Sequence, residues 1–366
     1  MRLKRSISLL VAVILMCSGL VACGTDDSNS TQTPSENTTN APGSGSVTQS
    51  ADSRSVTDQY GNVVEIPYEV KSICGTFPAI DAIVVMLGAG DKMVAATESN
   101  QKDEWMLRVR PGIEKLPAPF AEISAGNVEE LMQIAPDVII CSSEVEYDVL
   151  VSAGLTAVRV NTTSMAGIQD YIALIGEILG GTHAEKSKQL LDYYHANLDR
   201  VTSVTDKISE AERPTVFYSA GGTITTEANG SIVKEWIEVG GGINVAAANG
   251  VEGMFVDVTP EELMEWDPDI IICRDYATKA EYYDDPTLAS LSAVQNDKVF
   301  INPYGIFKWC VRSADEAIQP LWAASVIQPE LFTDIDMVEE CRQFHKEFYG
   351  LDLSDAEVDS ILFPTR

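Results

Sequence analysis

The sequence predicts an α/β protein with two similar lobes, and two observations lead to this prediction. A fourteen-residue segment occurs twice, as VEELMQIAPDVIIC at residues 128–141 and as PEELMEWDPDIIIC at residues 260–273, with nine of fourteen positions identical. Between the copies, an uninterrupted amphipathic stretch predicts one long helix. A unit that occurs twice at an offset of 132 residues indicates two lobes. A solenoid would need shorter periods and more copies.

Each copy of the repeat predicts a helix followed by a buried strand. Asn127 and Thr259 stand where an N-cap would lie, and a glutamate follows each of them three residues later, which is the spacing of a capping box. Each helix has to end before the proline in the second half of the repeat. The apolar runs that follow are typical of parallel strands buried on both faces.

The connecting helix is expected over residues 182–211. Thr182 and a glutamate three residues later form a second capping-box pattern, and apolar residues recur every three or four positions from Leu191 to Ile208. No glycine or proline intervenes before Pro214. Such a helix would be roughly 40 Å long, which is enough to join two lobes and to keep hinge motion small.

The two lobes are expected over residues 55–181 and 212–366. Residues 98–125 look irregular, and a loop of this length inside a compact domain is usually functional or mobile. A long helix is expected over residues 313–326, and further helices after it would cover the C-terminal lobe.

Residues 1–22 have the pattern of a signal peptide. Three basic residues precede a short apolar run from Ile7 to Met16, and the run is too short to span a bilayer comfortably. Residues 20–23 (LVAC) then resemble a bacterial lipobox, which implies cleavage before Cys23 and lipidation of that residue. Acyl chains on Cys23 would hold the protein at a membrane. An ordinary signal peptide cut elsewhere is the alternative.

Residues 23–54 are expected to form a flexible, lipid-anchored linker. They consist almost entirely of Ser, Thr, Asn, Gly, Asp, Gln and Pro, which cannot bury enough apolar surface to become ordered. The whole chain has 366 residues and a formal charge of −30, from 25 basic and 55 acidic residues. This charge argues against a nucleic-acid partner, which requires a basic surface.

Several segments together resemble the substrate-binding proteins of metal-chelate ABC importers, which take up ferric siderophores, haem and corrinoids. They are residues 127–137, the turn VGGGINV at 239–245, the segment LGAGD at 87–91 and the connecting helix. The resemblance covers about residues 55–366. It implies two Rossmann-like lobes joined by a long helix, with the ligand in the cleft between them. It also implies a monomer without an intrinsic cofactor, which delivers a metal complex to a permease dimer driven by an ATPase.

The ligand site is expected beyond the carboxyl ends of the parallel strands, as in other open α/β sheets. Aromatic faces would suit a flat chelate, and arginines would suit its carboxylates. The candidate residues are Thr76, Phe77, Ser142, Ser143, Glu144, Tyr218, Arg274, Tyr304, Trp309 and Arg312. Tyr218 and Phe77 could equally belong to the core, and Arg312 could simply pair near a helix end.

Glu129 and Glu261 match the positions at which members of the resembled family pair with arginines of the permease. They occupy equivalent positions in the two copies of the repeat. Both are also expected in the first turn of a helix, where the helix dipole favours any carboxylate.

The cysteines and histidines do not predict a metal site. Five cysteines follow the linker, at positions 74, 141, 273, 310 and 341, and we interpret them as small core residues. A soft-metal site is not excluded by their positions. The three histidines fall on predicted helices and form no evident ligand cluster.

Three alternatives to chelate import remain. A molybdate or tungstate ion could be held by Arg274 or Arg312 with Ser142 and Ser143. A surface sensor or adhesin could use the same scaffold. An extracytoplasmic hydrolase is the third, but the chain has no Gly-x-Ser-x-Gly or His-Glu-x-x-His motif and no evident catalytic triad. We therefore expect a binding protein rather than an enzyme.

Overall fold

The computed structural model describes residues 52–120 and 127–365. The predicted signal peptide, the lipidation site Cys23 and nearly all of the linker lie outside the described residues. The residues in these two ranges belong to one compact unit. In the two described ranges, no helix is both long and apolar enough to cross a membrane.

The N-terminal lobe is built on a three-stranded parallel sheet with the strand order β3-β4-β5. The strands are Ile73–Gly75, Val138–Cys141 and Ala157–Arg159, and an antiparallel hairpin of β1 (Ser53–Thr57) and β2 (Val63–Pro67) precedes them. The α-helices of this lobe are α1 (Pro78–Met86), α2 (Glu98–Lys102), α3 (Glu104–Val109), α4 (Val128–Ile134), α5 (Glu144–Ser152) and α6 (Met165–Leu179), with 3-10 turns at Gly90–Lys92 (η1) and Ile113–Lys115 (η2). Helices α2 and α3 correct the expectation of an irregular segment over residues 98–125.

The C-terminal lobe is built on a four-stranded parallel sheet with the order β11-β10-β6-β8. Its strands are β6 (Thr215–Ser219), β8 (Ile243–Asn244), β10 (Ile270–Cys273) and β11 (Val299–Ile301), and β7 (Thr225–Thr226) pairs with β9 (Val256–Asp257) beside it. Its α-helices are α8 (Ile232–Val239), α9 (Val245–Ala248), α10 (Pro260–Trp266), α11 (Tyr276–Asp284), α12 (Ser292–Gln295), α13 (Gln319–Ile327), α14 (Met337–Tyr349) and α15 (Asp355–Leu362). The 3-10 turns are Glu210–Glu212 (η3), Leu288–Ser290 (η4) and Ala314–Ala317 (η5).

The repeated segment forms the same helix–strand unit in both lobes, as predicted. Asn127 accepts a hydrogen bond from the backbone of the third helical residue of α4, and Thr259 forms a complete capping box on α10. Both helices end on a left-handed residue, Ala135 (φ 48°) and Asp267 (φ 38°). The strands that follow, β4 and β10, are buried at every position and lie inside their sheets.

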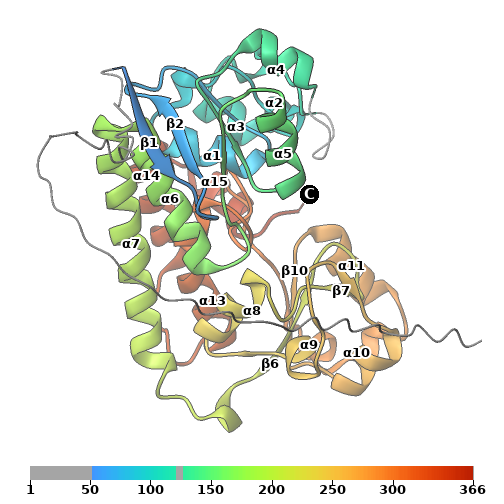
Figure 1. The fold of residues 1–366 in the computed structure, drawn as a ribbon. Coiled ribbons are helices and arrows are strands. Elements are labelled where there is room, and N and C mark those ends of the chain that lie inside the picture. The colour runs from blue at the N-terminus through green and yellow to red at the C-terminus, as the bar shows by residue number, and fades with distance from the viewer. Residues whose placement is uncertain (1–51, 121–126, 366) are drawn as a thin grey trace, which may run out of the picture. The chain divides into compact units, whose positions relative to one another are not determined.

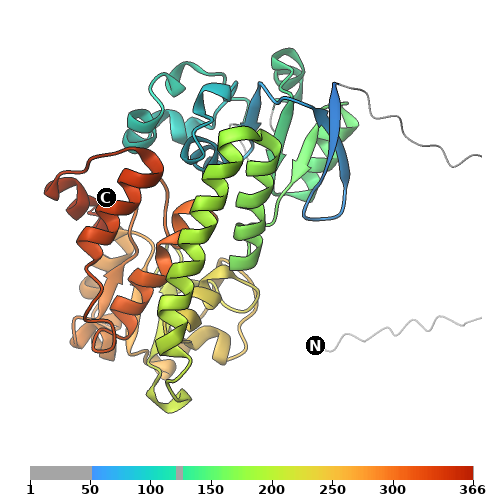
Figure 2. The same ribbon diagram turned by 90° about the vertical axis from the view of Figure 1, so that its left-hand side faces the viewer.

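The connecting helix α7 (Gly181–Thr205) has 25 residues, which corresponds to about 37 Å. It runs past both lobes, with α6 beside it for part of its length (Figures 1 and 2). Two details of the prediction were wrong. The N-cap is Gly180 rather than Thr182, and the helix ends at Thr205 rather than at residue 211. The carbonyl oxygen of Thr205 accepts a hydrogen bond from the guanidinium of Arg213 (2.7 Å), which satisfies the helix end.

The segment that leads into the final helices also differs from expectation. Residues 313–326 were expected to form one helix, but η5 and α13 are separate, and Pro320 lies in the first turn of α13. Proline is tolerated there because the first helical N–H groups have no partner within the helix. One core cluster includes Ile83 of α1, Tyr194 of α7 and Trp236 of α8, so a continuous apolar core connects both lobes with α7.

Candidate functional site

The carboxyl ends of the two sheets are linked by direct contacts between the lobes. The ring of Phe77, which follows β3, packs edge-on against Phe307, beyond β11, with the ring centroids 5.9 Å apart. The hydroxyl of Tyr304 donates a hydrogen bond to Asp103, at the start of α3 (2.8 Å). Phe77 and Tyr304 were both predicted from strand ends, and each of them contacts a residue of the other lobe.

Three basic residues gather at the carboxyl edge of the C-terminal sheet, and we call Arg274, Lys308 and Arg312 the cationic cluster. Arg274 directly follows β10, and the other two lie in the segment between β11 and η5. All three are partly exposed. The guanidinium carbons of Arg274 and Arg312 lie 5.6 and 5.2 Å from the ring centroid of Phe255. One aromatic ring thus has two guanidinium groups beside it.

Arg312 is held by groups below the surface. Its Nη2 lies 3.3 Å from a carboxylate oxygen of Glu227, whose side chain is fully buried. The same nitrogen lies 3.1 Å from the sulfur of Met254. The backbone of Arg312 is left-handed (φ 58°), which is uncommon for a residue with a side chain. These contacts fix the position of the guanidinium group.

Lys308 is the base of the cluster that lies beside two aromatic rings. Its ammonium lies 4.7 Å from the ring centroid of Tyr304 and 5.7 Å from that of Phe307. Burial lowers the pKa of Lys308, and the positive charge of Arg274 lowers it further. An anion placed beside Lys308 and Arg274 would relieve this repulsion.

On the N-terminal lobe, the predicted residues form hydrogen bonds with their neighbours. Thr76 is buried and donates a hydrogen bond to Glu146 (2.9 Å), which itself is buried. Ser143 caps α5, and Glu144 is exposed and forms an ion pair with Arg159 (3.4 Å). Ser142 is partly exposed beside them.

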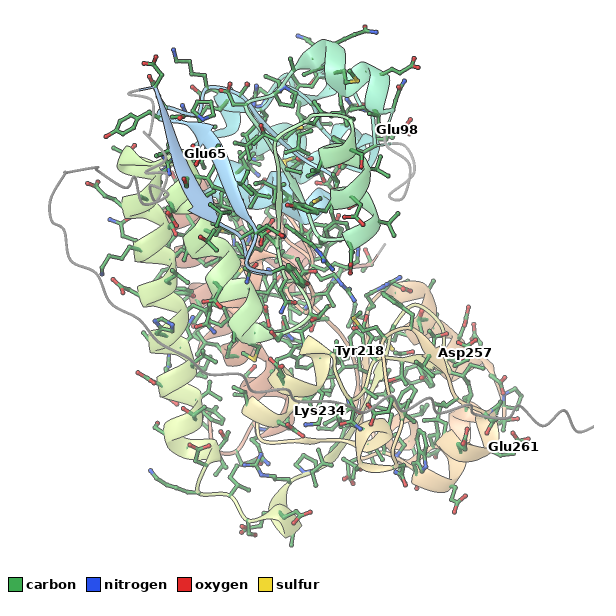
Figure 3. All side chains as sticks on the ribbon, in the orientation of Figure 1. Glu65, Glu98, Tyr218, Lys234, Asp257 and Glu261 are labelled. Carbon is green, nitrogen blue, oxygen red and sulfur yellow. The ribbon has the colours of Figure 1, made fainter. Side chains whose placement is uncertain are left out.

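Two predicted ligand contacts belong to the core instead. The side chain of Tyr218, which is labelled in Figure 3, is fully buried. Its hydroxyl lies 3.3 Å from the sulfur of Cys310. Trp309 is also fully buried, and it packs near His345 with ring centroids 6.3 Å apart. Aromatic rings bury large apolar areas, and here that burial stabilises the core rather than a ligand.

The sequence interpretation missed Lys308, Phe255 and Glu227. Lys308 was detectable, because it stands among the residues that follow β11. Phe255 and Glu227 had no such signal, because neither follows a strand of the parallel sheet. Only the fold brings them next to Arg312.

A pocket of about 370 Å³ adjoins the contact between Tyr304 and Asp103. It is lined by Lys102, Asp103, Glu104, Trp105, Tyr304, Ser360, Pro364 and Thr365. An ion pair lies nearby and also links the lobes. It joins Arg108 of α3 to Glu357 of α15. Tyr304 lines this pocket, and its ring is contacted by Lys308 of the cationic cluster.

The five cysteines in the described ranges are all free and buried, as expected for small core residues. Burial raises the pKa of the Cys310 thiol to about 11, so it remains protonated and unreactive at neutral pH. Within residues 52–120 and 127–365, no group of three or more His, Cys, Asp or Glu side chains could hold a metal ion.

Comparison with known proteins identifies the family. A family model described as periplasmic binding protein matches residues 73–303. The chain belongs to the periplasmic binding protein family. The members of this family are extracytoplasmic solute-binding proteins of ABC transporters rather than enzymes. The predicted family and the predicted two-lobe α/β fold are thus confirmed.

Individual relatives are distant. The molybdate-binding protein MolA of Haemophilus influenzae is 23% identical over 327 residues, which cover 81% of this chain and 91% of MolA. A cobalamin-binding protein of Halobacterium salinarum is 25% identical over 183 residues, 48% of each protein. The crystal structure of a periplasmic solute binding protein from Veillonella parvula superposes with a TM-score of 0.73 at 26% identity, covering 85% of this chain and 97% of that one.

Proposed function

We propose that this protein captures a metal chelate of the ferric siderophore, haem or corrinoid type and delivers it to the permease dimer of an ABC importer. The observation that carries the proposal is the cationic cluster, in which both arginines lie within 5.6 Å of the ring centroid of Phe255. In a chain with 55 acidic and 25 basic residues, three bases at one sheet edge favour an anionic ligand there. Among these chelates, the cluster favours those that carry acidic groups.

A compact oxyanion such as molybdate or tungstate is the second candidate. Its support is the similarity to MolA over most of both chains. Arginine and lysine side chains would bind such an ion as well. The two candidates differ in the apolar surface of the ligand, which a chelate has and an oxyanion lacks.

Native mass spectrometry combined with a visible absorbance spectrum would test the proposal. The protein, without residues 1–23, would be purified from cells grown in rich medium. We expect a bound mass together with a chelate absorbance band. A colourless protein carrying an ion the size of molybdate would favour the oxyanion. A colourless, empty protein whose melting temperature is unchanged by haemin, ferric enterobactin, cyanocobalamin or molybdate would favour a sensor or adhesin.

We also propose that lipid on Cys23 anchors the protein to the outer face of the cell membrane. The support is the sequence pattern of residues 1–23. Residue 23 itself lies outside the described ranges. In cells fed radioactive palmitate, the parent protein should be labelled and a Cys23→Ala variant should not. Equal labelling of both proteins would contradict the anchor.

A further inference from the structure

Phe255 is an unusual residue because it combines backbone strain with exposure. Its φ is 54°, in the left-handed region that bulky residues rarely occupy. Its side chain is 49% exposed, and that of the preceding Met254 is 37% exposed. The left-handed backbone of Phe255 costs conformational free energy, and the exposure of two large apolar side chains to water costs hydration free energy. Some other interaction therefore has to stabilise this arrangement.

The backbone around Phe255 is fixed on both sides. Gly253 (φ 102°) exchanges backbone hydrogen bonds with the loop after β7, donating to the carbonyl of Asn229 (2.9 Å) and accepting from Ala228 (3.0 Å). On the other side, Val256 pairs with Thr226 in the β7–β9 ladder. The surrounding structure therefore holds the strained residue in place, as is usual where strain serves a function.

The side chains around the ring are fixed as well. Arg312 is bound to the buried Glu227, and it contacts both the sulfur of Met254 and the ring of Phe255. Arg274 lies against Gly221 (φ 110°), where an added Cβ would come 2.6 Å from Nη2. Because Gly221 has no side chain, Arg274 has room to approach Phe255.

We propose that Phe255, supported by Met254, determines the ligand specificity of the site by selecting solutes that join an anionic group to an apolar face. This inference rests on the proposed function and names the class of chelate. The arginines would bind the anionic group, and the exposed part of the ring would pack against the apolar body of the ligand.

The physical reason is that an exposed aromatic ring gains binding free energy when the apolar surface of a ligand covers it. A chelate such as haem, or a ferric siderophore with aromatic groups, removes apolar area of Phe255 from water while its acidic groups contact the arginines. A tetrahedral oxyanion is hydrated on every side and gains nothing from the ring. The ring should therefore raise the affinity for chelates and leave the affinity for oxyanions unchanged.

The experiment compares the binding of haemin, ferric enterobactin and sodium molybdate by isothermal titration calorimetry, using protein without residues 1–23. The main variant is Phe255→Asn, because asparagine tolerates the left-handed conformation while the ring is lost. Phe255→Tyr retains the ring. Met254→Ala removes the neighbouring thioether without changing the strained position. Tyr68→Asn removes an aromatic side chain that is 70% exposed elsewhere, and it serves as the matched control.

We expect Phe255→Asn to weaken binding of the preferred chelate by about tenfold or more and to leave molybdate binding unchanged. Phe255→Tyr and Tyr68→Asn should bind like the parent. Met254→Ala should weaken chelate binding by about threefold, which tests the inference even if Phe255→Asn fails to fold. Chelate binding at parental affinity by folded Phe255→Asn, or by Met254→Ala, would overturn the inference while the proposed function stands. A parent protein that binds molybdate but neither chelate would overturn both.

Discussion

At the scale of single residues, the site depends on charges that the fold places next to each other. Arg274 and Arg312 come from different loops, and their guanidinium groups lie within 5.6 Å of the same ring centroid. Neither guanidinium lies at the end of a long solvated side chain. Both belong to residues that are only partly exposed. Charge-assisted hydrogen bonds formed in such surroundings are stronger than those formed in bulk water.

Removing either arginine should weaken the binding of an anionic ligand. We expect Arg274→Gln and Arg312→Gln each to lower the affinity by about 10- to 100-fold, which corresponds to the loss of one or two charge-assisted hydrogen bonds. Titration calorimetry at two salt concentrations would measure this, and the variants should also bind with a weaker salt dependence. Arg342→Gln is the control, since Arg342 pairs with Asp355 on the surface (2.7 Å). Parental affinity in both cluster variants would exclude the cluster as the binding site.

Asp315 is a buried acid that should make stability depend on pH. The carboxyl group is fully buried in η5 and accepts a hydrogen bond from the hydroxyl of Tyr349 (2.8 Å). Burial raises the pKa of Asp315 to about 7. In the unfolded chain, the carboxyl group of Asp315 has the ordinary pKa of about 4. Its contribution to the stability of the folded state is therefore complete below pH 4 and is lost as the pH rises from about 4 to 7. The total loss for this group is roughly 4 kcal/mol.

An Asp315→Asn variant should lack this dependence, because the amide remains neutral at every pH. We expect the melting temperature of the parent to fall between about pH 4 and pH 7 relative to that of the variant. Differential scanning calorimetry across this range would measure the difference. His345 acts in the opposite direction, because burial lowers its pKa to about 4, but it is present in both proteins. Parallel stability curves for the two proteins would show that Asp315 does not titrate in this range.

At the scale of elements, close contact between α6 and α7 stabilises the connection between the lobes. Gly176 of α6 faces Ser187 of α7, and an added Cβ at Gly176 would lie 2.4 Å from the Cβ of Ser187. The hydroxyl of Ser187 also donates a hydrogen bond to the carbonyl of Ile172 (2.8 Å). The two helix backbones can therefore approach closely only because residue 176 has no side chain.

Gly176→Ala should destabilise the protein, although the same change in an exposed helix normally stabilises it by about 1 kcal/mol. We expect a loss of about 1–3 kcal/mol in the free energy of unfolding, because the added methyl group forces the helices apart. Denaturant unfolding would measure it. In the double variant with Ser187→Gly, the steric conflict is removed, so the two changes should cost less together than the sum of their separate effects. Strict additivity would contradict the close packing.

At the scale of the whole molecule, the internal repeat places one glutamate at an equivalent position on each lobe. Glu129 lies in the first turn of α4 and Glu261 in the first turn of α10, and both are exposed (Figure 3 labels Glu261). We propose that these two carboxylates dock onto a permease dimer. A partner built from two like subunits would present matching basic groups to the two lobes.

Reversing both charges should abolish uptake and leave ligand binding intact. We expect the Glu129→Arg, Glu261→Arg double variant to bind its ligand like the parent, because both substituted residues are exposed in the first turns of α4 and α10, whereas the cationic cluster lies in the segments that follow β10 and β11. Transport of the radiolabelled ligand into cells would be lost. The control is Glu185→Arg with Glu347→Arg, which makes the same change in net charge at exposed positions of α7 and α14. Normal uptake by the first double variant would exclude these residues as docking contacts.

Features that depend on neighbouring residues could be predicted from the amino-acid sequence. The repeat predicted two helix–strand units, and Asn127 and Thr259 do cap their helices because a cap needs only a few consecutive residues. The buried strands β4 and β10 followed from their uninterrupted apolar runs. The connecting helix was predicted, but its end at Thr205 was not, because Arg213 completes that end from beyond the helix.

Which side chains form the proposed site depends on the tertiary structure. The strand-end rule identified Arg274 and Arg312, but Tyr218 and Trp309 turned out to be fully buried. An apolar run does not reveal which neighbour covers each side chain, so burial could not be predicted for these rings. Phe255 and Glu227 reach Arg312 across 57 and 85 residues of sequence, the differences between position 312 and positions 255 and 227. Contacts of this kind depend on how sheets and loops pack in three dimensions, and no local pattern encodes them.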